Sequence, residues 1–145
     1  MHPNLYDQDL YTWAMTSARL LREGRLDELD RDHLAEELES MGKSELRALE
    51  SRLTVVLAHL LKWQFQPERH GKSWQRTLVE QRKRISRLLR DSPSLRPRLP
   101  ALLPDAYDSA LRLAAEETGL DETDFPAACP YGVEQALALD FYPET

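Results

Sequence analysis

The sequence predicts an all-α protein, an up-and-down helical bundle of four main helices followed by short helical turns near the C-terminus. Two observations favour this fold class. Apolar residues recur every three or four positions over most of the chain, and no stretch alternates between apolar and polar residues. Valine is scarce and isoleucine occurs once, at Ile85, so residues that favour strands are few. The length of 145 residues predicts a single helical domain over residues 1–145.

The N-terminal part of the chain predicts two helices. The first spans residues 9–23, and Gly24 is expected to end it by adopting the left-handed backbone conformation. Its expected inner face comprises Leu10, Trp13, Ala14, Ser17, Leu20 and Leu21. The second spans residues 30–41 and begins at an aspartate cap. Its apolar stripe comprises Leu34, Leu38 and Met41. We expect Gly42 to break or kink the chain after it.

A third helix over residues 44–65 is expected to be central. Its seam of apolar residues has alternating spacings of three and four: Leu46, Leu49, Leu53, Val56, Leu60 and Trp63. Residues 55–61 are apolar on nearly all sides, which is typical of a helix buried by several neighbours. Full burial is therefore expected for Leu53, Val56, Leu57 and Leu60. Pro67 ends the helix, because proline disfavours a helical residue before it.

The C-terminal half predicts two further helices. One spans residues 73–90, with an apolar inner face and a basic outer face. Pro97, Pro100 and Pro104 suggest a turn over residues 94–103, because an interior proline costs a helix about 3 kcal/mol. A regular helix should then run over residues 104–118 and end at a glycine.

The tail predicts short helical turns. One is expected over residues 121–125 and another over residues 133–139.

Charge is distributed very unevenly along the chain. Residues 62–98 hold 11 Lys and Arg against 3 Asp and Glu, whereas the whole chain has a net charge of −6. Residues 99–145 hold 1 basic and 10 acidic residues. A basic helix can bind a polyanion, or it can be neutralised by acidic helices of its own fold. We expect partial neutralisation by residues 104–124.

Several segments carry a family resemblance. They are LYDQDLYTWAMTSARLLREGRLDELD at 5–30, LAEELESMGKSELRALESRL at 34–53, VLAHLLKWQFQPER at 56–69, SWQRTLVEQRKRI at 73–85, DSPSLRP at 91–97 and AAEETGL at 114–120. The chain resembles, over nearly its whole length, a bacterial family known as domain of unknown function 29. The pattern H-L-L-K-W-x-x-Q-P at 59–67 is the most specific segment. The resemblance implies an all-helical bundle and implies no activity.

The residue pattern offers little support for catalysis or metal binding. His33 and Glu37 lie one turn apart, but a metal site needs a third ligand, so an exposed side-chain contact is the favoured interpretation. His59, in an apolar run, is interpreted as a hydrogen-bonded core histidine. Cys129 has no neighbour that would activate it, and it leaves no partner for an internal disulfide. No catalytic residue, cofactor or metal is therefore expected.

Aromatic and cationic residues interleave between the third and fourth helices, as in proteins that bind single strands. They are Lys62, Trp63, Phe65, Gln66, Arg69, His70, Lys72 and Trp74. The favoured interpretation is that both tryptophans are largely buried at the end of the bundle.

Two main functions remain open. The favoured one is a protein-interaction or adaptor bundle without catalytic activity, which binds another protein or itself. The alternative is nucleic-acid binding through the basic face of helix 73–90, although the acidic net charge disfavours it. Either would use the candidate contact residues Arg69, Lys72, Arg76, Lys83, Arg87 and Arg90. A pocket for a small ligand is a third, weaker hypothesis. No apolar run is long enough to span a membrane, and a cytoplasmic location is expected.

Overall fold

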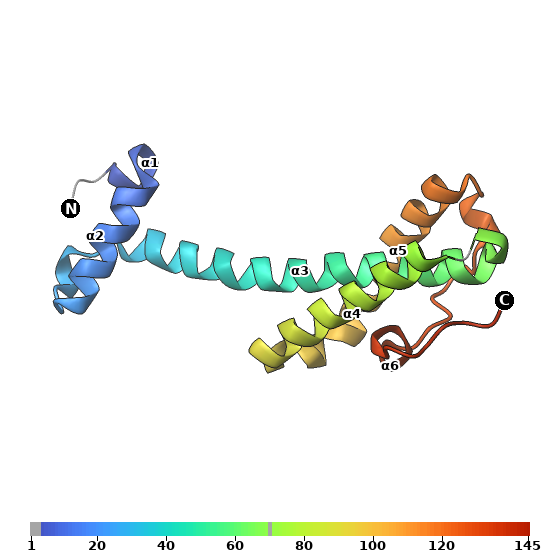
Figure 1. Ribbon diagram of the computed structural model, residues 1–145. Coiled ribbons are helices and arrows are strands. Elements are labelled where there is room, and N and C mark those ends of the chain that lie inside the picture. Colours follow the sequence, from blue (N-terminus) through green and yellow to red (C-terminus); the bar gives the residue numbers. More distant parts are fainter. Residues whose placement is uncertain (1–3, 70) are drawn as a thin grey trace. The chain divides into compact units, whose positions relative to one another are not determined.

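The computed structural model describes residues 4–69 and 71–145 (Figure 1). Its helices are α1 Leu5–Gln8, α2 Leu10–Arg22, α3 Arg31–Phe65, α4 Lys72–Asp91, α5 Leu99–Thr118 and α6 Val133–Leu137. These residues contain no strand, so the predicted all-α fold class, with four long helices, is confirmed. The chain divides into two compact units, Met1–Ser44 and Glu45–Thr145, which are described separately below as unit 1 and unit 2.

In unit 1, α2 begins and ends where its local sequence predicts. The Asp9 carboxylate accepts hydrogen bonds from the backbone nitrogen and the hydroxyl of Thr12, at 3.0 and 2.7 Å. The helix is followed by Gly24, whose φ of +73° lies in the left-handed region that glycine adopts without strain. The expected inner face is only partly covered. Trp13, Ser17 and Leu20 are buried, whereas Leu10 and Leu21 are exposed.

Helix α3 corrects the prediction of two separate helices. It is continuous over 35 residues and passes through Gly42 without a break. A mid-helix glycine costs only about 1 kcal/mol relative to alanine. The strong helix formers on both sides outweigh that cost. In unit 2, Leu53, Val56, Leu57 and Leu60 of this helix have no exposed surface, so their predicted burial is confirmed.

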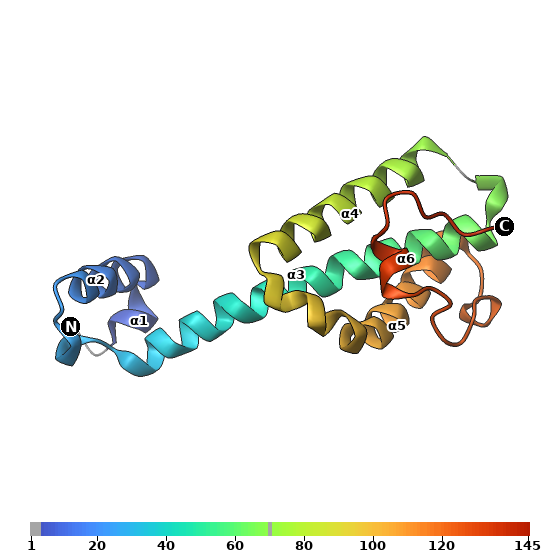
Figure 2. The same ribbon diagram turned by 90° about the horizontal axis from the view of Figure 1, so that it is seen from below.

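Unit 2 packs α4, α5 and α6 against residues 45–65 of α3 (Figure 2). A short 3-10 helix, Pro93–Arg98, follows α4 and leads directly into α5. Helix α5 therefore begins five residues earlier than predicted. Pro100 occupies its first turn, where no N–H is needed, and Pro104 lies inside the helix. The helix ends, as predicted, at Gly119, whose φ is +77°.

The C-terminal segment completes the core of unit 2. Its elements are a single 3-10 turn, Glu122–Asp124, and α6, which ends two residues earlier than predicted. The Tyr107 hydroxyl on α5 donates a hydrogen bond to the carbonyl of Pro126, at 2.6 Å. The Phe65 and Phe125 rings meet edge to face, with centroids 5.6 Å apart. None of the described helices combines the length and the apolarity that a membrane span requires.

Candidate interaction surfaces

The outer face of α4 carries a row of cations. The inner face of α4 packs into the core of unit 2 through Leu78, Ile85 and Leu89. The residues opposite them form what we call the α4 ridge, and all are exposed: Lys72, Arg76, Lys83, Arg87 and Arg90. Five of the six contact residues chosen from the sequence thus lie along one helix. The sixth, Arg69, is exposed in the 3-10 turn Pro67–Arg69 that precedes α4.

Direct ion pairing leaves most of the α4 ridge uncompensated. Arg90 lies 3.9 Å from Asp91, its neighbour in sequence. For Lys72, Arg76, Lys83 and Arg87, no carboxylate among the described residues lies within 4.0 Å. The expected pairing of this face with residues 104–124 is therefore wrong. Instead, the acidic residue Glu117 of that segment pairs with Lys62 on α3.

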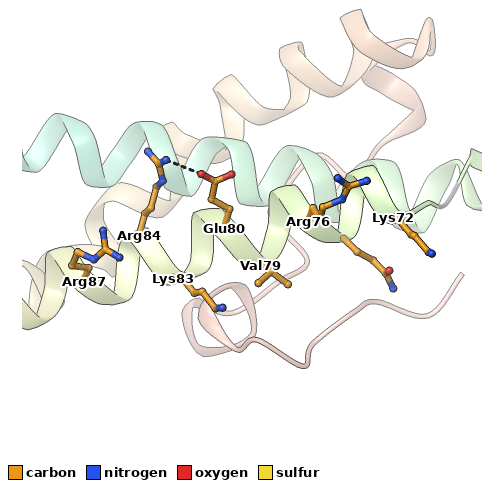
Figure 3. A pocket seen from close by; sticks show the side chains of 8 residues that line it. Lys72, Arg76, Val79, Glu80, Lys83, Arg84 and Arg87 are labelled. Carbon is orange, nitrogen blue, oxygen red and sulfur yellow. Dashed lines mark hydrogen bonds and ion pairs between the residues drawn. The ribbon is translucent and has the colours of Figure 1, made fainter.

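Two hollows are each lined by three or more cations of the α4 ridge. The larger, of about 790 Å³, is lined by α4 residues from Lys72 to Arg87 and lies between their long side chains (Figure 3). Within it, Arg84 pairs with Glu80 at 2.7 Å. The second hollow, of about 410 Å³, has walls from α4 and from the α6 segment, and we call it the Arg82 hollow. It is lined by Arg82, Lys83, Ser86, Arg87, Arg90, Leu137 and Leu139.

Arg82 is a buried cation beneath this second hollow. Its side chain is 1% exposed, and its Nε and Nη2 atoms donate hydrogen bonds to the carbonyls of Ala136 and Gln135, at 2.8 and 3.3 Å. These carbonyls belong to the last turn of α6, where a cation is favoured by the helix dipole. The remaining nitrogen, Nη1, has no hydrogen-bond partner in the described part of the chain. Burial lowers the pKa of Arg82.

Unit 1 holds a surface of the opposite character. A groove of about 510 Å³, which we call the α2–α3 groove, lies between α2 and the first part of α3. Its exposed apolar side chains are Leu10, Leu21, Leu38 and Met41, with exposed fractions of 53, 49, 64 and 67%. Trp13 and Ser17, both buried, also line it. The sequence placed these residues on apolar stripes, but it could not show that the stripes remain uncovered.

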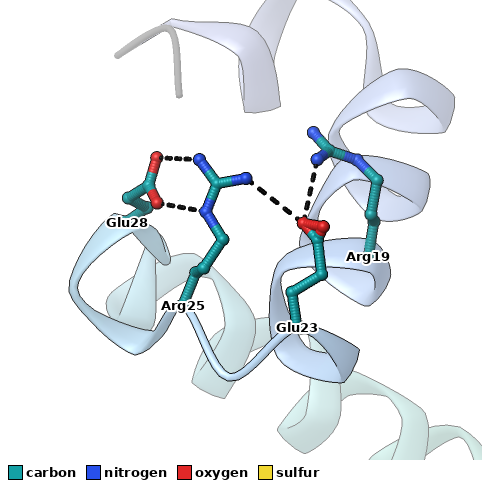
Figure 4. Close-up of polar contacts among 4 residues, drawn as sticks. All are labelled: Arg19, Glu23, Arg25 and Glu28. Atoms are coloured by element: carbon teal, nitrogen blue, oxygen red, sulfur yellow. Dashed lines mark hydrogen bonds and ion pairs between the residues drawn. The ribbon is translucent and has the colours of Figure 1, made fainter.

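Polar contacts hold the loop after α2. Arg25 bridges two carboxylates, with Nη1 3.2 Å from Glu23 and Nε 2.5 Å from Glu28 (Figure 4). Arg19 also contacts Glu23, at 3.2 Å. Arg25 lowers the pKa of Glu28 through these hydrogen bonds.

Aromatic stacking and a carboxylate–imidazole contact support the start of α3. The ring of Tyr6 stacks on His33, with centroids 3.9 Å apart, and its hydroxyl donates a hydrogen bond to Glu37. The Nδ1 atom of His33 lies 2.6 Å from Asp30, whose carboxylate raises the pKa of the imidazole. The two residues considered as metal ligands, His33 and Glu37, are thus each engaged with another partner.

The sequence comparison decides the family. The chain matches the family described as Domain of unknown function DUF29 over residues 5–142. It belongs to the DUF29 family. The resemblance inferred from the sequence segments is therefore confirmed. No curated protein and no solved structure matches the chain. Because the description of DUF29 states no activity, the function has to be inferred from the surfaces.

His59 and Cys129 of unit 2 fit structural roles in this DUF29 chain. His59 is 9% exposed and its Nδ1 atom lies 2.9 Å from the carbonyl of Val55, so the predicted core histidine is confirmed. Burial, with the nearby Lys62, lowers the pKa of His59. Burial raises the pKa of the Cys129 thiol, which makes it a poorer nucleophile. In the described parts of the chain, no three His, Cys, Asp or Glu residues are grouped to hold a metal ion.

The two tryptophans beside the α3–α4 turn, Trp63 and Trp74, are partly buried, and neither is exposed. Trp63 packs on Tyr142, with ring centroids 4.7 Å apart. The Lys62 Nζ atom lies 5.2 Å from the centre of the Trp74 ring. Both indoles of this DUF29 chain thus contact its own side chains. His70, from the same interleaved run, lies outside the described residues.

Proposed function

We propose that this protein is an interaction module that binds one amphipathic helix of a partner protein in the α2–α3 groove. The observation that carries the proposal is the exposure of four large apolar side chains in one groove, each by about half or more. Contiguous exposed apolar surface on a folded protein typically marks a binding site. A groove between two helices is suited to the apolar face of a third helix.

The small core of unit 1 supports this proposal. Among its described residues, Trp13 and Leu20 are the buried hydrophobic side chains. A chain segment of this length is near the limit at which a unit can bury enough surface by itself. A bound helix would cover Leu38 and Met41 and gain roughly 1 kcal/mol for each half-exposed side chain that it buries. Partner binding would thus also stabilise unit 1.

Charge indicates which kind of helix fits. Residues 1–44 hold 10 acidic and 5 basic residues, and Glu37 lines the groove itself. A helix with lysines or arginines beside its apolar face would complement this field, whereas a second copy of unit 1 would bring like charges together. We therefore assign the groove to a basic amphipathic helix of another protein.

The test uses the full chain and a model helix as the probe. The probe is a 14-residue peptide of leucine and lysine in an amphipathic pattern. One comparison peptide has the same composition in a scrambled order, and a second has glutamate in place of lysine. Isothermal titration calorimetry should detect the first peptide and neither of the others. Binding by the scrambled peptide to the same extent would contradict the proposal, because charge alone would then explain it.

Matched variants locate the binding surface. Leu38→Ser combined with Met41→Ser should weaken binding of the probe at least tenfold, and Tyr11→Ser should leave it unchanged. Tyr11 is the control because it is 75% exposed and does not line the groove. Circular dichroism should show the same helical content in all variants. Sedimentation equilibrium tests whether a second copy of the chain occupies the groove instead. If the chain forms a dimer, and the Leu38 and Met41 changes abolish that dimer, the groove binds a second copy and the assignment to a partner helix is overturned.

A further inference from the structure

We propose that the Arg82 hollow, between α4 and the α6 segment, is a binding site for a phosphate group. This inference concerns unit 2 and is independent of the α2–α3 groove. Three exposed cations on consecutive turns of α4, Lys83, Arg87 and Arg90, border the hollow. The hydroxyl of Ser86 adds a donor that lies between them in sequence. Guanidinium and ammonium groups, together with a hydroxyl, are the side chains that bind phosphate oxygens most strongly.

These cations are free to bind an external anion. In the described structure, no carboxylate lies within 4.0 Å of the side-chain nitrogens of Lys83 or Arg87. Arg90 has one such contact, with Asp91 at 3.9 Å, which is close to the limit for an ion pair. An incoming phosphate would therefore not need to displace a strong internal partner. Surface cations whose charge is uncompensated attract anions and accelerate their association.

Arg82 provides an independent reason to expect an anion. It lines the hollow while being 1% exposed, and no carboxylate of the described chain forms an ion pair with it. A buried charge without a counter-charge is costly, and two carbonyl hydrogen bonds offset only part of that cost. The Tyr142 ring, whose centre lies 5.8 Å from the guanidinium carbon, and the exposed carboxylate of Asp140 favour the charged form, but neither forms an ion pair with Arg82 in the described structure. A phosphate bound above Arg82 would supply the missing negative charge at short range.

The shape of the hollow points to a phosphate ester rather than to inorganic phosphate alone. Its volume of about 410 Å³ exceeds what one phosphate group fills and lies within the usual range for small-ligand sites. Leu137 and Leu139 provide an apolar side to the hollow. We assign the cations to the phosphate and the two leucines to the organic group that carries it.

Two sources share this chemistry, a free phosphate ester and the backbone of a nucleic acid. The α4 ridge extends beyond the hollow to Arg76 and Lys72. At 1.5 Å per residue, the ridge from Lys72 to Arg90 is roughly 27 Å long. A small ester needs only the cations that border the hollow. A nucleic-acid backbone would also use Arg76 and Lys72.

The experiment separates these sources with three probes and two charge-matched variants. The probes are inorganic phosphate, ATP and a 16-base-pair DNA duplex, each titrated into the full chain by calorimetry at 50 and 200 mM salt. Lys83→Gln with Arg87→Gln removes two cations from the hollow. Lys72→Gln with Arg76→Gln removes two cations from the same helix outside it. All four side chains are exposed, so both variants should fold. The Nε–H signal of Arg82 in a nitrogen–proton NMR spectrum reports on the hollow directly.

For a free ester, ATP should bind more tightly than inorganic phosphate and shift the Arg82 signal. The Lys83 and Arg87 changes should then weaken ATP binding at least tenfold, and the Lys72 and Arg76 changes less than twofold. The duplex could bind instead, with an affinity that falls steeply with salt and that both variants reduce. The phosphate group would then belong to a nucleic-acid backbone, and the proposed phosphate site would still be supported. The proposal is overturned if none of the probes binds, or if the Lys83 and Arg87 changes leave binding unaltered.

Discussion

The ammonium group of Lys62 on α3 donates a hydrogen bond to the carboxylate of Glu117 on α5, 55 positions later in the chain. The Lys62 side chain is 6% exposed, whereas that of Glu117 is 42% exposed. The Trp74 ring from α4 lies 5.2 Å from the same ammonium group. A single buried cation therefore connects three helices of unit 2. The nearly complete burial of the Lys62 side chain requires a partner, because an unpaired buried charge is strongly unfavourable.

Removing this partner should destabilise unit 2. We expect Glu117→Gln to lower the free energy of unfolding by about 1–2 kcal/mol, because it weakens a charge-assisted hydrogen bond to a buried group. Urea unfolding followed by circular dichroism measures the change. Glu116→Gln is the control, since Glu116 is exposed and makes no ion pair in the described structure. Equal stability of the two variants would show that Lys62 does not depend on Glu117.

The two described histidines should titrate on opposite sides of the ordinary value of 6.5. Asp30 raises the pKa of His33, and burial lowers the pKa of His59. NMR titration of the imidazole ring protons measures both. Asp30→Asn should lower the pKa of His33, leave that of His59 unchanged and retain the helix cap. A pKa for His33 at or below 6.5 would contradict the contact with Asp30.

These shifts also set the pH dependence of stability. The raised pKa of His33 means that the contribution of its contact with Asp30 is fully present below about pH 6.5 and is lost as the pH rises through the raised value. For His59 the dependence of stability on pH has the opposite sign, because its pKa is lower in the folded chain and the unfolded chain therefore binds the proton more readily. Stability should fall as the pH drops below about 6.5. The His59→Gln variant should lose that acid-side dependence, which urea unfolding across pH 5–8 would measure.

Two glycines in helices should respond in opposite directions to alanine. Gly119 has a φ of +77°, so Gly119→Ala should destabilise the chain by roughly 1 kcal/mol. Gly42 lies inside α3, and a methyl group there would meet no atom within 4 Å. Gly42→Ala should therefore stabilise the chain by about 0.5–1 kcal/mol. Thermal unfolding compares the variants, and a destabilising Gly42→Ala would argue against a continuous α3.

Two leucines of α3 test the difference between the core and the groove. Leu60 is fully buried, so Leu60→Ala should cost about 2–5 kcal/mol. Leu38 is 64% exposed, and Leu38→Ala should change the free energy of unfolding by less than about 0.5 kcal/mol. Urea unfolding at low protein concentration gives both values. A large cost at Leu38 would mean that the α2–α3 groove is already covered in solution.

The helices could be predicted because their signals are local. The cap at Asp9, the stop at Gly24 and the seam from Leu53 to Leu60 each depend on neighbours within a few turns. The errors arose where local signals compete. Gly42 and Pro104 both weaken a helix, but neither cost is large enough to end one when the surrounding residues favour it.

By itself, the sequence determined the fold class, the burial of α3 from Leu53 to Leu60 and the single row of cations on α4, since periodicity and composition encode them. The family followed from the resemblance of whole sequence segments. Only the tertiary structure decided which faces are covered. It placed Glu117 beside Lys62 instead of beside the α4 ridge, buried Arg82 below a hollow, and left Leu38 and Met41 exposed. The physical reason is that an amphipathic pattern states which side of a helix is apolar, whereas burial depends on which distant segment packs there.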